Sequence, residues 1–115
     1  MTKYTKRHYE EVASVLADEG QLLRAIAKSD KEKYDNGKIS FKHALNLKTQ
    51  DNASMETLQS IAKRFDAKFR ADNERYRTET FYKACNIGEF HKVDDRVVFK
   101  PIEYEMTMDI NKIKQ

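Results

Sequence analysis

Apolar residues recur at helical spacing along the first part of the chain. Four of them fall at positions i, i+3, i+4 and i+7: Tyr9, Val12, Ala13 and Leu16. This stripe predicts a helix over residues 6–28, with the Thr5 hydroxyl as its N-cap. Gly20 interrupts the stripe, and glycine costs about 1 kcal/mol relative to alanine inside a helix. Either one kinked helix or two short helices would fit this part of the sequence.

A second stripe, farther along, is the most regular in the chain. Its apolar residues repeat every three or four positions: Met55, Leu58, Ile61, Ala62, Phe65 and Phe69. They predict a helix over residues 55–71. The polar segment 49–54 is expected to be a break before this helix and to supply its N-cap. Asn73 tolerates a left-handed backbone and is expected to end the helix.

The segment between the two stripes contains a turn and an ambiguous element. Asn36 and Gly37 predict a turn, because both residues tolerate a positive φ. Residues 39–47 alternate in part like a strand, but they also fit a helix that is capped by Ser40. Alanine, leucine and lysine dominate the second half of this segment, and their helix propensity favours the helix.

A short third helix is expected after the second stripe. It covers residues 79–85, with Thr78 as its N-cap and Phe81 facing inward. Asn86 or Gly88 is expected to end it, since both residues suit a left-handed helix end.

The end of the chain alternates between apolar and polar residues. After a short apolar run at 97–99 and the single proline, Pro101, one side of the segment 102–110 is apolar throughout: Ile102, Tyr104, Met106, Met108 and Ile110. The residues between them are polar: Glu103, Glu105, Thr107 and Asp109. A period of two predicts a half-buried strand.

These elements together predict a mainly α protein. We expect a small helical domain of three to four helices over residues 1–90, with a C-terminal β-strand or hairpin extension over 91–115 in the same structural unit. The first helix cannot bury its stripe alone, so it is expected to pack on the second. The expected core consists of Tyr9, Val12, Leu16, Leu58, Ile61, Phe65, Phe69, Phe81 and Ala84.

Composition limits the size and the setting of this domain. The chain has 115 residues, enough for one domain, of which 39% are apolar and 36% charged. A modest core follows, and self-association would help to stabilise it. The single cysteine, Cys85, excludes an intramolecular disulfide and fits a reducing compartment. The polar N-terminus and the lack of a long apolar run predict a cytoplasmic protein without membrane insertion.

The residues that could bind a metal or catalyse a reaction do not form a recognised pattern. His8, His43 and His91 are scattered, and none belongs to a set with zinc-ligand spacing. Segment 72–75 is rich in oxygen ligands but too short for a calcium loop, so a cap and turn are expected there. Cys85 is expected to be a small buried core residue. We therefore expect no catalytic residue, no metal site and no cofactor.

Basic residues gather between positions 63 and 83, although acidic residues are interspersed among them. The formal net charge is +3, and this mixture favours an ordinary salt-bridged surface over a nucleic-acid interface. If the chain does bind nucleic acid, the best candidates are Arg64, Lys68, Arg75 and Arg77. Tyr76 and Tyr82 lie among them in sequence and could stack on bases.

The alternating segment 102–110 also predicts self-association. The chain offers few other strands to pair with it, and an isolated hairpin is marginal in water. An unpaired strand edge invites another chain. We therefore expect a homo-oligomer, with Tyr104, Met106 and Met108 at or near the interface.

One stretch of the sequence resembles a known family. The residues Phe69, Asp72, Asn73, Arg75, Tyr76, Phe81, Ala84 and Cys85 match the pattern F-x-x-D-N-x-R-[FY]-x4-F-x-x-A-C. This pattern is similar to one found in small, mostly uncharacterised proteins of tailed bacteriophages and prophages.

The resemblance implies a setting in the cytoplasm of an infected bacterial cell. Together with the small size and the missing catalytic motifs, it leads us to expect a non-enzymatic accessory protein that binds a host protein. Inhibition of a bacterial defence system is one form that this activity could take. The alternative is an accessory protein that binds nucleic acid.

Overall fold

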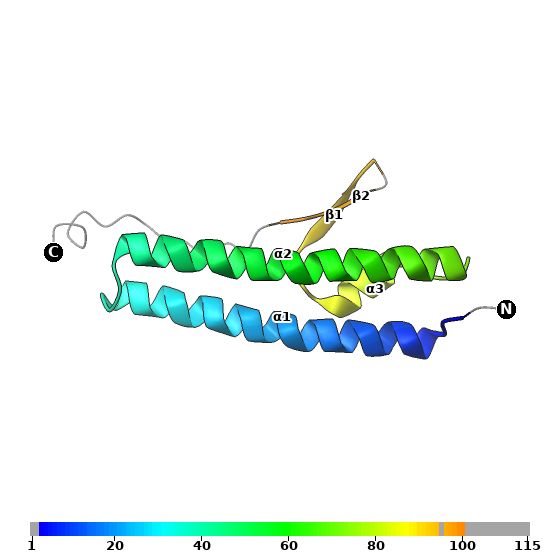
Figure 1. The fold of residues 1–115 in the computed structure, drawn as a ribbon, viewed down its shortest axis with the longest axis horizontal. Helices are drawn as coiled ribbons and strands as arrows, with labels where there is room; N and C mark the ends of the chain where they lie inside the picture. The colour runs from blue at the N-terminus through cyan, green and yellow to red at the C-terminus, as the bar shows by residue number, and fades with distance from the viewer. Residues whose placement is uncertain (1–2, 95, 101–115) are drawn as a thin grey trace.

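The computed structural model describes residues 3–94 and 96–100 and shows a long helical hairpin with two smaller elements packed on it. In chain order these elements are α1 (Lys6–Asp35), α2 (Phe41–Asp72), α3 (Thr78–Cys85), β1 (Phe90–Val93) and β2 (Arg96–Phe99). Figure 1 shows α1 and α2 side by side and antiparallel, with α3 and the β-hairpin on the half farther from their connecting turn. The expected mainly helical fold with a β-hairpin on its C-terminal side is confirmed.

The β-hairpin is a two-stranded antiparallel sheet. Phe90 pairs with Phe99 at one end, and Val93 pairs with Arg96 at the other. The rings of Phe90 and Phe99 both contact Tyr82 of α3, at centroid distances of 5.6 and 5.5 Å, which anchors the hairpin to the helices. The predicted strand 102–110 and the predicted interface residues Tyr104, Met106 and Met108 lie outside the described residues.

Helix α1 is longer than predicted and has no break at Gly20. It continues to Asp35 instead of ending near residue 28. Gly20 lies within the helix and is buried, because the side chain of Ile87 packs where a Cβ would be: an added Cβ would lie 3.1 Å from Ile87 Cγ2. The glycine therefore allows a close approach between elements and does not interrupt the helix.

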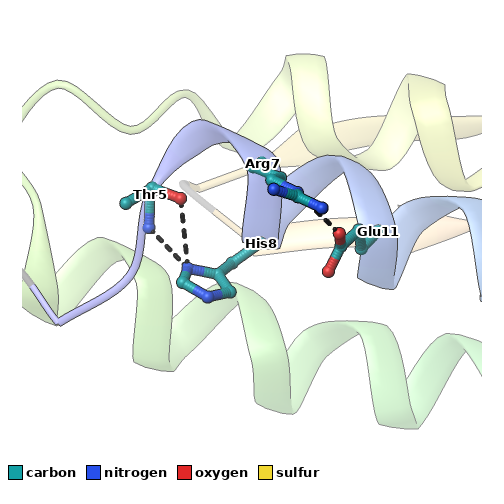
Figure 2. A network of polar contacts seen from close by, with 4 residues as sticks. All are labelled: Thr5, Arg7, His8 and Glu11. Carbon is teal, nitrogen blue, oxygen red and sulfur yellow. Dashed lines mark hydrogen bonds and ion pairs between the residues drawn. The ribbon is translucent and has the colours of Figure 1, made fainter.

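The caps of α1 follow the sequence prediction. Thr5 is the N-cap, and its backbone N–H donates a hydrogen bond to Nδ1 of His8 at 2.9 Å (Figure 2). The predicted turn at Asn36 and Gly37 follows the C-terminal end of the helix, and Gly37 adopts a φ of +73°. His8 is thus part of the helix start, with an Nε2–H tautomer implied by its acceptor role at Nδ1.

Helix α2 is one continuous helix, so the predicted break at 49–54 is wrong. Ser40 caps it as expected, accepting a hydrogen bond from the His43 N–H at 3.1 Å, and residues 41–47 are helical. The helix then continues through the polar segment, where Asp51 is buried beside α1 and Thr49 donates its hydroxyl hydrogen to the Leu45 carbonyl. Packing against a second long helix overrides the weak local propensity of this segment.

The connection from α2 to α3 differs from the prediction in two details. Asn73 does not adopt the left-handed conformation: its φ and ψ are −145° and 117°, because the chain leaves α2 in an extended conformation toward α3. Helix α3 begins at Thr78 with Arg77 as N-cap, one residue earlier than expected. Asn86, with a φ of 48°, ends α3 in the predicted left-handed conformation.

The core lies between α1, α2 and α3 and is centred on Phe69. The ring of Phe69 contacts those of Tyr4, Tyr9, Tyr76 and Phe81 at centroid distances between 4.6 and 5.6 Å. The other predicted core residues also contribute: Leu16 is buried, and Val12, Leu58, Ile61 and Phe65 pack against the core from partly buried positions. The packing of α1 on α2 is confirmed.

Ala84 is the exception among the predicted core residues, because it is exposed. Helix α3 buries Phe81, Tyr82 and Cys85. Its short length leaves Ala84 on the side that faces away from this core.

Candidate functional site

A pocket of about 320 Å³ lies where the start of α1 meets the α2–α3 connection and α3. Aromatic side chains from all three parts form its apolar wall: Tyr9, Tyr76 and Phe81. Its remaining lining is largely polar or charged and consists of Lys6, Glu10, Asn73, Arg75, Arg77 and Thr80, together with Ala84. We refer to this as the α1–α3 pocket.

The aromatic wall is held in place by ring contacts and a hydrogen bond. The Tyr9 ring lies 4.6 Å from that of Phe69 and 4.9 Å from that of Tyr76. The Asn73 side-chain amide donates to the Tyr9 hydroxyl at 3.2 Å. The position of Tyr9 therefore depends on the end of α2, which is 64 residues away in the sequence.

Asp72 joins the N-terminal segment to the end of α2. Its two carboxylate oxygens accept hydrogen bonds from the backbone N–H groups of Lys3 and Tyr4, each at 2.8 Å. These hydrogen bonds favour the charged carboxylate and hold the pKa of Asp72 below its usual range. The segment that leads into α1 is thereby fixed beside the pocket.

The oxygen-rich segment 72–75 is a cap and turn, as expected from its length. The Arg75 backbone N–H donates to the Asn73 side-chain oxygen at 3.0 Å, which closes a short turn after α2. This turn places the Arg75 side chain at the pocket. Among the described residues, neither Arg75 nor Arg77 has an ion-pair partner.

A buried polar network lies behind the pocket. The Tyr76 hydroxyl donates to Asp66 at 2.7 Å, and Arg70 Nε contacts the other oxygen of this carboxylate at 3.0 Å. Burial, together with the hydrogen bond to Asp66, raises the pKa of Tyr76 well above its usual value. The hydroxyl therefore remains protonated and serves as a hydrogen-bond donor to a buried charge.

Neither predicted base-stacking tyrosine is available at the surface. Tyr76 is 8% exposed and Tyr82 is 2% exposed, because both rings pack into the core. Their proposed stacking on bases is therefore wrong. Sequence position alone placed them among basic residues, but the rotation of α3 directs Tyr82 toward the β-hairpin.

Cys85 is fully buried in the core, as predicted. Burial raises the pKa of its thiol to about 12, so the thiol is protonated at neutral pH. In the described part of the chain, no group of three or more histidine, cysteine, aspartate and glutamate side chains could hold a metal ion.

The four candidate nucleic-acid residues lie in two separate places. Arg75 and Arg77 line the α1–α3 pocket. Arg64 and Lys68 border a smaller depression of about 220 Å³ on α2, together with Ile61 and Phe65. The structure thus gives two basic pairs and does not unite them in one pocket.

The sequence analysis did not identify Lys6, Tyr9 and Thr80 as site residues. Tyr9 was expected in the core, and it does contact the core, but its exposed part also lines the pocket. The available signal was the family-like pattern, since Asn73, Arg75, Tyr76, Phe81 and Ala84 all belong both to that pattern and to the lining.

Comparisons with protein-family models, with curated proteins and with solved structures found no match. Among the described residues, no helix has the length and apolar character needed to cross a membrane.

Proposed function

We propose that this chain is a small, non-enzymatic accessory protein of a tailed bacteriophage that binds a protein of the host cell through the α1–α3 pocket. One observation supports this more than any other. Five of the eight residues in the phage-like pattern line the pocket: Asn73, Arg75, Tyr76, Phe81 and Ala84. The part of the chain that suggests an origin is therefore also the part that forms the best candidate site.

The lining indicates the chemistry of the partner. An aromatic wall made by Tyr9 and Phe81 suits an apolar or aromatic side chain. Arg75 and Arg77, which have no ion-pair partner among the described residues, suit a carboxylate beside it. The proposed partner presents an apolar side chain next to aspartate or glutamate on an exposed segment.

The setting follows from the resemblance. A phage protein of this size acts in the cytoplasm of an infected bacterium, and a host protein is the corresponding partner. A component of a bacterial defence system is the narrower form of the proposal. Binding of such a component would inhibit it without any chemical step by this chain.

Affinity capture from the lysate of a bacterial host tests the proposal. We expect the tagged chain to retain a host protein, and the double variant Arg75→Ala/Arg77→Ala to lose it. The matched control is Lys28→Ala/Lys42→Ala, which removes the same charge from exposed positions outside the pocket. Equal capture by the pocket variant and the control would contradict the role of the pocket.

Nuclease treatment separates the proposal from its alternative, an accessory protein that binds nucleic acid. The two unpaired arginines at the pocket are the observation that favours this alternative. Capture that survives nuclease supports a protein partner. Capture that disappears after nuclease, or the absence of any captured protein, would contradict direct protein binding.

A further inference from the structure

The α1–α2 hairpin has one face that α3 and the β-hairpin leave uncovered. Helix α1 contributes Val15, Leu22 and Ile26, which are 63%, 56% and 42% exposed. Helix α2 contributes the partly buried Leu58, Ile61 and Phe65. We call these six residues the open face.

Helix geometry places the open face opposite the smaller elements. On α1, Gly20 contacts Ile87 and Arg24 donates to the Asn86 carbonyl, so these two residues mark the side that faces α3. Leu22 and Ile26 each follow one of them by two positions, which is a rotation of about 200°. On α2, Gln59 donates to the Ile87 carbonyl at 2.9 Å, and Ile61 again follows by two positions.

We propose that a second copy of this chain packs on the open face, so that two hairpins form an antiparallel four-helix bundle. Apolar stripes on two adjacent helices are what such a bundle buries. A two-fold axis along the hairpin would place α1 of each copy on α2 of the other. The contact would then be isologous, with the same surface used twice.

The charges beside the open face favour a second copy over an unrelated partner. Asp18 and Glu19 flank the stripe on α1, whereas Arg64 and Lys68 flank the stripe on α2. None of these four residues forms an ion pair with another described residue of its own chain. The proposed two-fold arrangement brings the acidic edge of one copy to the basic edge of the other, at two equivalent places.

The size of the face is sufficient for a stable dimer. A helix of 30 residues such as α1 is about 45 Å long, and two packed helices are roughly 20 Å wide. Their product is close to the ~800 Å² that each partner contributes to a standard interface. This inference is independent of the α1–α3 pocket, which lies on other residues.

Light scattering coupled to size-exclusion chromatography tests the inference. We expect the full chain to have twice its monomer mass of 13.5 kDa. The double variant Leu22→Glu/Ile26→Glu should be monomeric with an unchanged helical circular dichroism spectrum, because both side chains are exposed in the single chain. The control Leu45→Glu alters another exposed leucine outside the open face and should leave the dimer intact.

A charge exchange tests the arrangement within the dimer. Glu19→Lys and Arg64→Glu should each raise the dissociation constant at least tenfold, and the combination should restore it in part. A monomeric full chain at 0.5 mM, a dimer that persists in Leu22→Glu/Ile26→Glu, or a combination with no recovery would overturn the proposal. A dimer that responds only to changes at Tyr104, Met106 and Met108 would also overturn it.

Discussion

At the scale of single residues, the most unusual feature is a pair of carboxyl groups between α1 and α2. Asp30 and Asp51 are each 7% exposed, and one oxygen of each has no hydrogen-bond partner among the described residues. Burial raises the pKa of Asp51 to about 6, and the hydrogen bond with Asp30 and the charge of Asp30 contribute further. Two buried carboxylates in contact are expected to share a proton.

This pair predicts a stability that decreases as the pH rises. The folded protein retains a proton on the pair between pH 4 and pH 6, where an unfolded aspartate has lost it. The free energy of unfolding should therefore fall over this interval, by at most about 3 kcal/mol, and remain lower above it. Asp51→Asn should remove most of this dependence and stabilise the protein at pH 7.5, as measured by urea denaturation.

The control for this prediction is Glu56→Gln, which neutralises an exposed acid on the same helix. It should leave the pH dependence of the wild type unchanged. An Asp51→Asn variant that is less stable than the wild type at pH 7.5 would show that the charged carboxylate is needed in the fold.

At the scale of elements, the contact of α1 with the end of α3 determines where the β-hairpin begins. Ile87 is fully buried and packs against Gly20, while its carbonyl accepts from Gln59 on α2. Arg24 donates to the neighbouring Asn86 carbonyl at 2.6 Å. Two side chains and one missing side chain on the long helices thus hold the chain as it leaves α3.

Gly20→Val tests this contact. Valine has a higher helix propensity than glycine, so an exposed position would become more stable. At Gly20 the Cβ would lie 3.1 Å from Ile87 Cγ2 and 3.3 Å from the Asn86 carbonyl oxygen, and overpacking of this kind costs about 1–3 kcal/mol. We expect thermal denaturation to show a lower melting temperature. The control Ser14→Val, at an exposed position of α1, should change it little.

A Gly20→Val variant as stable as the wild type would mean that α3 and Ile87 can move away from α1 without loss. In that case the glycine would be incidental to the packing of the two elements.

At the scale of the whole molecule, the charges do not form one continuous basic surface. The 22 basic and 19 acidic residues give a net charge of only +3. Arg64 and Lys68 lie at one depression, and Arg75 and Arg77 lie at another. The tyrosines that could have supplied stacking are buried. This distribution favours binding to a protein over binding along a nucleic-acid backbone.

We therefore expect no saturable binding to single- or double-stranded DNA at 150 mM salt, as measured by fluorescence anisotropy with labelled oligonucleotides. Binding at this salt concentration that weakens in Arg64→Ala/Lys68→Ala would contradict the expectation. In that case each lost phosphate contact should reduce the log–log salt slope by about 0.9 for duplex DNA.

The sequence by itself determined the features that depend on neighbouring residues. The apolar stripes predicted helices that pack on each other, Ser40 predicted a cap, and Asn36 with Gly37 predicted the turn between the long helices. The burial of Cys85 also followed from its place on the stripe of a short helix. Spacing and capping operate within one or two helical turns, so they are readable without knowledge of the rest of the fold.

Only the tertiary structure decided features that depend on residues distant in the sequence. Segment 49–54 is helical because α1 packs beside it, and Gly20 is tolerated because Ile87 occupies the space of its missing side chain. The α1–α3 pocket exists because Asp72 binds the backbone of Lys3 and Tyr4, nearly 70 residues away. A local pattern shows which residues share a face of a helix, but the partner that covers the face decides which of them are buried.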